Sequence, residues 1–304
     1  MNWFILSLVA PFFWSIANYL DKYLLTKRNK GVGSGGLLII SALVSGIISF
    51  FIYVHIGPSV HVIDSQVAGA LILSGIFEAL YIYFYFVALE RESTTTVVSL
   101  FQLAPIMGLI FGYLMLSEIP NKDQLVGVGL VLLGTLFVIK KKGERFSFKN
   151  GVLPLMLAST AFVGIFSTIF KIAAEDVPFW TAIYWQYLGI AALGFILFMA
   201  IGPHRRETHL MLGKSGFKVL LITTFAEIAN VGALLTTNAA VLLAPVALVL
   251  SIASVQPVIV FIEGLLLMIF FPRFLKGEDR VRLNFQYILG ILLTCAGGAY
   301  IYMH

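Results

Sequence analysis

The sequence is poor in charge and almost free of cysteine. Only 12% of its 304 residues are charged, against roughly 25% in a typical soluble domain. The single cysteine, Cys295, cannot form an intrachain disulfide, and its apolar surroundings indicate a packed membrane residue. A water-soluble fold of this length is excluded by the small amount of polar sequence available for its surface.

Common enzyme motifs are also missing. The chain has no GxxxxGK[ST] loop, so ATP-driven transport by this chain alone is not expected. It has neither HExxH nor GxSxG. Its histidines lack metal-ligand spacing; they are His55, His61, His204, His209 and His304. We therefore predict a protein that is not an enzyme, with no catalytic residues, no metal site and no cofactor.

The sequence is instead rich in long apolar runs. It is 60% hydrophobic and its mean hydropathy is +0.97. A helix needs about 20 apolar residues to cross a bilayer. Ten runs approach this length: 3–25, 36–55, 66–89, 94–116, 124–140, 151–172, 178–201, 216–239, 244–271 and 284–303. The first run lacks a basic leader, so it is interpreted as a spanning helix and not as a cleavable signal. We predict an all-α polytopic membrane protein.

The two halves of the chain resemble each other. A shift of 152 residues superimposes run 94–116 on run 244–271, and it aligns Ser99 with Ser251 and Pro105 with Pro257. We therefore predict two repeats, residues 1–145 and 146–304, each with five helices. An odd number of helices places the repeats in the membrane with opposite orientations. Inverted repeats with a central site are typical of secondary transporters.

The first repeat carries motifs of a known family. They are Phe86-Val87-Ala88-Leu89, Gln102-Leu103-Ala104-Pro105, Gly112, Glu118-Ile119-Pro120, Gly127 and Gly134. In these positions the chain resembles the EamA-type module of the drug/metabolite transporter superfamily. The resemblance implies a ten-helix fold over nearly the whole chain, a self-sufficient monomer, and a substrate among amino acids, amines, drugs and nucleotide-sugars. The second repeat departs from the pattern, because Phe270 stands where Glu118 would recur.

Basic residues are distributed unevenly between the predicted loops. The loops after the odd-numbered helices carry 18 Lys and Arg residues, and those after the even-numbered helices carry only Lys122 and Lys171. Cytoplasmic loops of membrane proteins are enriched in Lys and Arg. We therefore predict a multi-pass protein of the plasma or inner membrane with both termini outside the cytoplasm.

Three carboxylates within the apolar runs are candidates for proton coupling: Glu78, Glu227 and Glu263. A charge at the centre of a membrane helix costs about 3 kcal/mol, so such residues are usually functional. Glu78 is followed at helical spacing by Tyr81 and Tyr85, which could hold an organic cation with it. The alternative for Glu78 is a hydrogen bond to a neighbouring helix that serves packing alone. For Glu263 an inter-helix or interfacial hydrogen bond is an equal alternative.

Polar and aromatic side chains on the same helices complete a predicted central cavity, lined by runs 3–25, 66–89, 94–116, 151–172, 216–239 and 244–271. The predicted substrate-binding residues are Trp14, Asn18, Glu78, Tyr81, Tyr85, Gln102, Tyr187, Glu227, Asn230, Asn238 and Gln256. Lys22 and Lys171 are gate candidates near helix ends on opposite membrane faces. The alternative for both lysines is snorkelling to the interface, with Lys171 paired to Glu175 at i+4.

These features together predict a secondary active transporter, an exporter of a small polar metabolite such as an amino acid or amine. Transport would proceed by alternating access, with possible coupling to protons. The partners expected are a small-molecule substrate and the lipid bilayer, with no nucleic acid. Two alternatives stay open: a non-transporting receptor or partner subunit, and a transporter of nucleotide-sugar-type or lipid-linked substrates.

Overall fold

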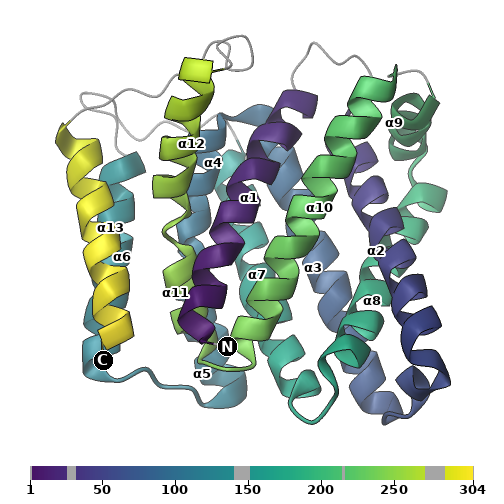
Figure 1. Cartoon of the computed structure of the whole chain (residues 1–304), viewed down its shortest axis with the longest axis horizontal. Coiled ribbons are helices and arrows are strands. Elements are labelled where there is room, and N and C mark those ends of the chain that lie inside the picture. Colours follow the sequence, from purple (N-terminus) through teal and green to yellow (C-terminus); the bar gives the residue numbers. More distant parts are fainter. Residues whose placement is uncertain (1, 26–31, 140–150, 214–215, 271–284, 304) are drawn as a thin grey trace.

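The computed structural model describes residues 2–25, 32–139, 151–213, 216–270 and 285–303 (Figure 1). All regular elements in these ranges are helical, which confirms the predicted all-α class. The α-helices are α1 (Trp3–Leu25), α2 (Ser34–Ile56), α3 (Ser65–Arg91), α4 (Thr94–Leu100), α5 (Ala104–Leu116), α6 (Lys122–Ile139), α7 (Val152–Ala174), α8 (Phe179–Ala200), α9 (Gly202–Gly213), α10 (Gly216–Val241), α11 (Val246–Ala253), α12 (Gln256–Phe270) and α13 (Phe285–Met303). Two 3-10 helices, η1 (Gly57–His61) and η2 (Phe101–Leu103), complete the set.

Eight helical segments of the described ranges are long and apolar enough to cross a membrane. They are Trp3–Leu25, Ser34–His61, Ser65–Arg91, Thr96–Leu116, Val152–Ala174, Phe179–Ala200, Val219–Val241 and Val246–Leu267. This confirms a multi-pass membrane protein. Helices α6 and α13 coincide with two further predicted runs but are not among the eight. The predicted count of ten crossings therefore stays a prediction.

Two of the predicted runs are broken in the middle. Run 94–116 is divided into α4, η2 and α5, and run 244–271 is divided into α11 and α12. Pro105 and Pro257 lie at these breaks. Proline has no N–H and its ring clashes with the preceding turn, so an α-helix does not continue through it without distortion. Each run still forms one candidate membrane span, Thr96–Leu116 and Val246–Leu267, and both breaks fall at prolines that the repeat aligns.

Helix α9 was not predicted. Its sequence is polar and contains Arg205 and Arg206, so it has none of the apolar length that marks a membrane span. The structure docks it on the N-terminus of α2, where the Gly36 N–H donates to Glu207 Oε2 at 2.9 Å. The basic sequence between two spanning helices is therefore a surface helix and not an irregular loop.

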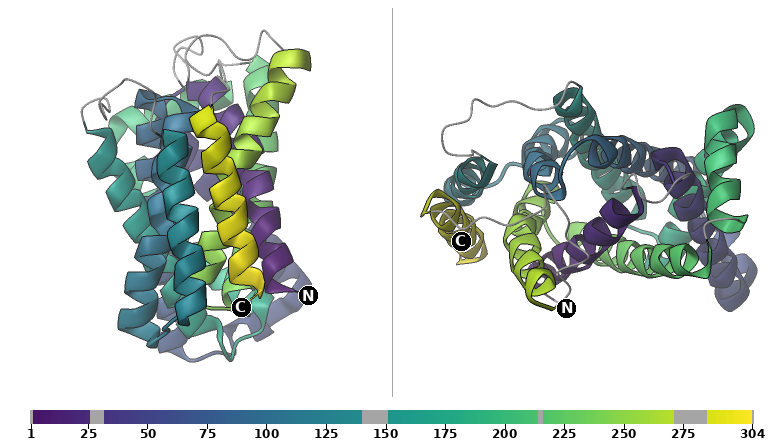
Figure 2. Two further views of the ribbon diagram at one scale, coloured as in Figure 1. Left: turned by 90° about the vertical axis from the view of Figure 1, so that its left-hand side faces the viewer. Right: turned by 90° about the horizontal axis from the view of Figure 1, so that it is seen from above.

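The main packing contacts join the first half of the chain to the second. Helix α1 packs along α10, α2 along α8, α3 between α7 and α8, and α6 along α13. The last pair lies at one end of the molecule, with α2, α8 and α9 at the other (Figures 1 and 2). Both termini lie on the same side (Figure 1). The two predicted repeats therefore interleave and do not form separate bodies.

Glycines permit the closest of these contacts. A Cβ at Gly127 would meet the Gly297 carbonyl oxygen at 3.0 Å, and one at Gly134 would meet the Gly290 carbonyl oxygen at 2.6 Å. The α6–α13 pair thus packs backbone against backbone. A second such contact, between α3 and α8, depends on Gly75 and Gly189, where an added Cβ would collide with backbone oxygens of the facing helix.

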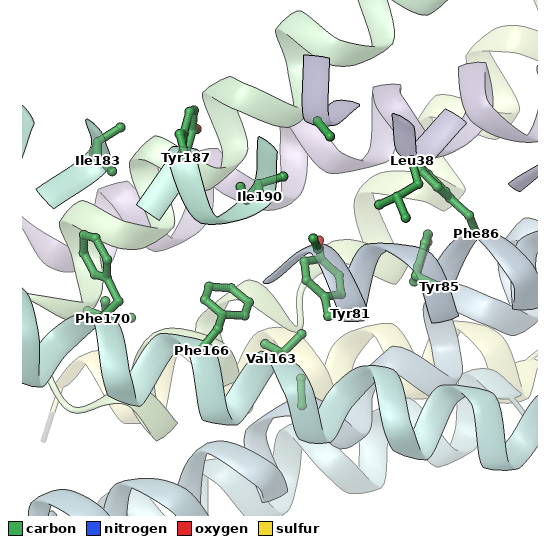
Figure 3. Packing of buried hydrophobic residues seen from close by; sticks show 14 of the residues in the cluster. Leu38, Tyr81, Tyr85, Phe86, Val163, Phe166, Phe170, Ile183, Tyr187 and Ile190 are labelled. Atoms are coloured by element: carbon green, nitrogen blue, oxygen red, sulfur yellow. The ribbon is translucent and has the colours of Figure 1, made fainter. Parts of the chain in front are cut away.

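The interior is aromatic and the outside is apolar. Tyr81, Phe166 and Tyr187 belong to the large core cluster between α3, α7 and α8 (Figure 3). Large side chains such as Phe50 and Leu114 are more than half exposed, which is the surface that lipid covers in a membrane protein. Cys295 in α13 is also exposed, so its predicted packing inside the protein was wrong.

Candidate functional site

A central cavity is enclosed by helices of both halves of the chain. The space that protein atoms leave unfilled is about 650 Å³, part of which is open to solvent. The first half of the chain lines the cavity with side chains of α1, α2, α3 and η2. The second half lines it with side chains of α8, α10 and α12. The cavity therefore requires both halves to be assembled.

Eight of the eleven predicted substrate-binding residues line this cavity: Trp14, Asn18, Tyr81, Tyr85, Tyr187, Glu227, Asn230 and Gln256. Helix α7, which we expected to contribute, does not line it, whereas α2 and α8 do. The reason is the packing of α7 on α3, where the Ser159 hydroxyl donates to the Tyr81 carbonyl at 3.1 Å. The polar face of α7 is thereby used for helix contact.

Two carboxylates face the cavity. Glu227 in α10 accepts a hydrogen bond at 2.6 Å from the hydroxyl of Ser41 in α2. Asp21 in α1 is only 2% exposed and interacts with Asn230 and, through charge, with Glu227. Asp21 was not among the predicted site residues, because it stands beside Lys22 near the end of its helix. The signal was its spacing, since Trp14, Asn18 and Asp21 follow at i, i+4 and i+7 on one helix face.

Aromatic and amide side chains form the rest of the cavity wall. The Tyr85 hydroxyl donates to Asn18 Oδ1 at 2.9 Å, which fixes the orientation of that amide. Phe101 of η2 packs against Tyr81 and Tyr85 with ring centroids 5.9 and 5.6 Å apart, and against Trp14 at 6.4 Å. No Lys or Arg of the described chain lines the cavity. The site is therefore acidic, with aromatic faces suited to an organic cation.

Glu78 lies behind the cavity wall and does not line it. Its side chain is fully buried, and neither carboxyl oxygen has a hydrogen-bond partner among the described residues. Tyr81 and Tyr187, which do line the cavity, lie close enough to Glu78 for electrostatic interaction. The alternative for Glu78 was a hydrogen bond to a neighbouring helix that serves packing. The described part of the chain contains no such hydrogen bond to its carboxyl group.

Three other predicted residues also lie outside the cavity. Asn238 Nδ2 donates to Gln186 Oε1 at 2.7 Å, and Gln186 in turn donates to Ser74, so this amide links α10 to α8 and α3. Gln102 Nε2 donates to the Val98 carbonyl at 3.3 Å within its own segment. Glu263 interacts with Ser15 of α1. The contacts of Asn238 and Glu263 join helices, the contact of Gln102 is local, and none of the three side chains lines the cavity.

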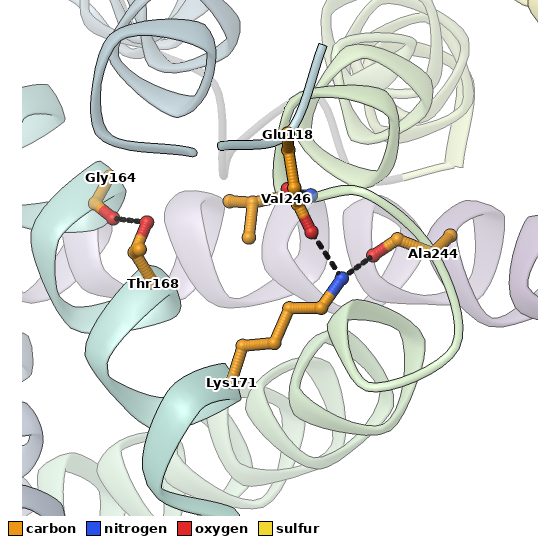
Figure 4. Close-up of polar contacts among 6 residues, drawn as sticks. All are labelled: Glu118, Gly164, Thr168, Lys171, Ala244 and Val246. Carbon is orange, nitrogen blue, oxygen red and sulfur yellow. Dashed lines mark hydrogen bonds and ion pairs between the residues drawn. The ribbon is translucent and has the colours of Figure 1, made fainter. Parts of the chain in front are cut away.

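The two gate candidates hold helix ends at opposite faces of the molecule. Lys171 Nζ donates to Glu118 Oε1 at 2.5 Å and to the Ala244 carbonyl at 2.7 Å (Figure 4). Glu118 Oε2 also accepts from the Val246 N–H at 2.9 Å, at the start of α11. Pairing of Lys171 with Glu175 was therefore the wrong expectation, because the partner comes from α5's end and lies 53 residues away in sequence.

Lys22 makes a matching contact. Its Nζ donates to the carbonyl oxygens of Leu89, in the last turn of α3, at 2.9 Å and of Glu92, directly after α3, at 2.6 Å. The 152-residue shift places Glu92 on Ala244, the carbonyl that Lys171 contacts. Each lysine therefore holds the equivalent turn in its own half of the chain, and neither lysine lines the cavity.

A metal centre has no support in the described ranges. They contain no group of three or more His, Cys, Asp or Glu side chains that could hold a metal ion.

Fold and site define the class: a multi-pass helical membrane protein with a polar cavity between its two halves. Residues 1–140 match the profile of the EamA-like transporter family, which belongs to the drug/metabolite transporter superfamily. The resemblance noted in the sequence is thus confirmed over that stretch.

Comparison with solved structures supports the fold. Twenty-eight chains of solved structures match. One crystal structure aligns with 98% of this chain and 96% of its own, with a TM-score of 0.66 and 20% identity. At this identity the likeness shows the fold alone. No curated protein matches the sequence.

Proposed function

We propose that this chain is a secondary transporter of small polar solutes that carry an ammonium group, such as amines or amino acids, which works by alternating access as an exporter. The observation that supports this most is the acidic and aromatic lining of a cavity shared by both halves. Asp21 and Glu227 supply negative charge, and Trp14, Tyr81 and Tyr85 supply ring faces. An anionic nucleotide-sugar would require basic groups, and none lines the cavity in the described residues.

The proposed architecture is two inverted five-helix repeats, residues 1–145 and 146–304, in a chain that crosses the membrane ten times. The matching lysine contacts support it, because Lys22 and Lys171 hold equivalent turns at opposite faces. Broken helices at Pro105 and Pro257 support it as well. Rocking of the two halves about the cavity would then expose it to each side in turn.

The proposed setting is the plasma or inner membrane, with both termini outside the cytoplasm and the monomer as the working unit. The distribution of Lys and Arg between the loops supports this orientation. Attachment of a membrane-impermeant thiol reagent to a cysteine introduced at residue 2 tests it. Labelling of intact cells is expected, and protection until the cells are opened would reverse the orientation.

Thermal unfolding of the purified protein against amines, amino acids and nucleotide-sugars tests the substrate class. A ligand present at 100 times its dissociation constant stabilises the folded state by about 2.7 kcal/mol. We expect stabilisation only by ligands that carry an ammonium group, which are the amines and amino acids of the panel. Stabilisation by anionic ligands alone would contradict the proposal. Counterflow in proteoliposomes then separates a transporter, which exchanges labelled for unlabelled solute, from a receptor, which binds without flux.

Glu78 is the proposed proton site, since its carboxyl group is fully buried and unpartnered in the described chain. We expect Glu78→Gln to abolish the pH dependence of counterflow, because glutamine cannot exchange a proton. Counterflow measured from pH 5 to pH 9 checks this. The matched control is Glu90→Gln, an exposed residue at the end of the same helix. Unchanged pH dependence in Glu78→Gln would remove Glu78 from the coupling mechanism.

A further inference from the structure

Asp21 and Glu227 come close together although 206 positions separate them in the sequence. Helices α1 and α10 pack along each other, and Asp21 interacts with Asn230. Asn230 follows Glu227 by three residues on α10, so the two side chains share one face about one turn, or ~5 Å, apart. Asp21 therefore lies about one helical turn from Glu227, on the same cavity wall.

The hydrogen bonds of these residues leave specific atoms free. Asp21 Oδ1 has no hydrogen-bond partner among the described residues, although its side chain is 2% exposed. Glu227 uses Oε1 to accept from Ser41. One turn before Asp21, Asn18 is held by Tyr85, and its Nδ2 has no partner in the described ranges. A buried acceptor without a partner costs free energy unless a ligand or water satisfies it.

The negative charge of two buried carboxylates has to be compensated, either by bound protons or by a cation. Two ionised carboxylates this close inside a membrane protein repel each other, so a positive charge between them would be strongly favoured. The nearest basic residue in the sequence, Lys22, directs its ammonium group to the carbonyls of Leu89 and Glu92 and does not line the cavity. A cation that compensates the two carboxylates would therefore come from a ligand and not from a Lys or Arg of the cavity lining.

We propose that Asp21 and Glu227 form one two-carboxylate site that binds a primary ammonium group of the transported solute. This deepens the proposed function and rests on it. A primary ammonium carries three N–H donors, so it can bridge two carboxylates on neighbouring helices. A quaternary ammonium has the same charge but no donor, and it would leave Asp21 Oδ1 unsatisfied. The aromatic rings of Trp14, Tyr81 and Phe101 would then cover the apolar part of the solute.

Two probes of equal charge and chain length test this: butylammonium and butyltrimethylammonium, titrated into purified full-length protein by calorimetry. We expect the wild type to bind butylammonium at least about tenfold more tightly, because charge-assisted hydrogen bonds are lost with the quaternary probe. Asp21→Asn is expected to weaken butylammonium by about tenfold or more and to remove most of the preference. Asp21→Glu, which keeps the carboxylate, is expected to retain the preference. Asp176→Asn is the matched control, since Asp176 is exposed in the turn after α7.

The outcomes separate this inference from the proposed function. Binding of neither probe by the wild type would overturn both. Tight butylammonium binding that is unchanged in Asp21→Asn would overturn the two-carboxylate site and leave transport of cations standing. Equal affinity for the two probes would overturn recognition through N–H donors. That last comparison uses the wild type alone, so the inference remains testable even if Asp21→Asn does not fold.

Discussion

Replacement of Lys171 by methionine is expected to lower the free energy of unfolding by about 3 kcal/mol. Lys171 and Glu118 are 20% and 15% exposed, and removal of one partner leaves the other charge largely buried. The substitution also removes the hydrogen bond to the Ala244 carbonyl. The thermal unfolding midpoint of the purified protein, compared with wild type in the same detergent, measures the effect.

A double-mutant cycle assigns this loss to the ion pair. In Lys171→Met with Glu118→Gln, no charge is left without its partner, so we expect the double variant to be less destabilised than the sum of the two single variants. Glu175→Gln is the control, because Glu175 was the partner that local helix spacing favoured and it is exposed. Additive effects of the two substitutions would show that the pair contributes nothing beyond its separate residues.

Substitution of Gly75 by alanine is expected to destabilise the protein by about 3 kcal/mol, the upper part of the range for overpacking. The new methyl group would collide with the Gln186 carbonyl oxygen of α8, and a backbone atom cannot rotate away as a flexible side chain can. Helices α3 and α8 would have to separate, and the Gln186–Ser74 hydrogen bond joins them one residue before Gly75. Thermal unfolding again provides the measurement.

Gly69 provides a matched control on the same helix. A Cβ at Gly69 meets nothing within 4 Å, and alanine favours a helix by up to about 1 kcal/mol over glycine. Gly69→Ala is therefore expected to be neutral or slightly stabilising. Equal losses for the two alanine variants would mean that backbone entropy or lipid contact, and not the α3–α8 contact, decides the effect at Gly75.

The helices could be predicted from the sequence because a membrane span is a local property. Twenty apolar residues are visible without knowledge of the rest of the chain. The same rule explains the failures. Helix α9 lacks apolar length, and the breaks at Pro105 and Pro257 divide runs that remain apolar throughout. Hydropathy does not distinguish a continuous helix from a broken one.

Only the part of the site that depends on single helices could be predicted from the sequence. Helical spacing indicates which residues share a face, so Trp14 and Asn18, and likewise Tyr81 and Tyr85, could be grouped. Spacing does not indicate which helix lies opposite. The contact of Lys171 with Glu118 and the approach of Asp21 to Asn230 depend on tertiary packing between the halves. Glu78 lies near the middle of α3, but only the structure placed it behind the tyrosines instead of on the cavity wall.

The exposed position of Cys295 makes the chain well suited to site-directed labelling. It is the single cysteine of the sequence, and it lies on the outer side of α13, away from the cavity lining. One replacement by serine or alanine therefore gives a cysteine-free background without disturbing a buried contact. Pairs of spin labels introduced at helix ends on either face, beside Lys22 and beside Lys171, could then report whether one face opens as the other closes.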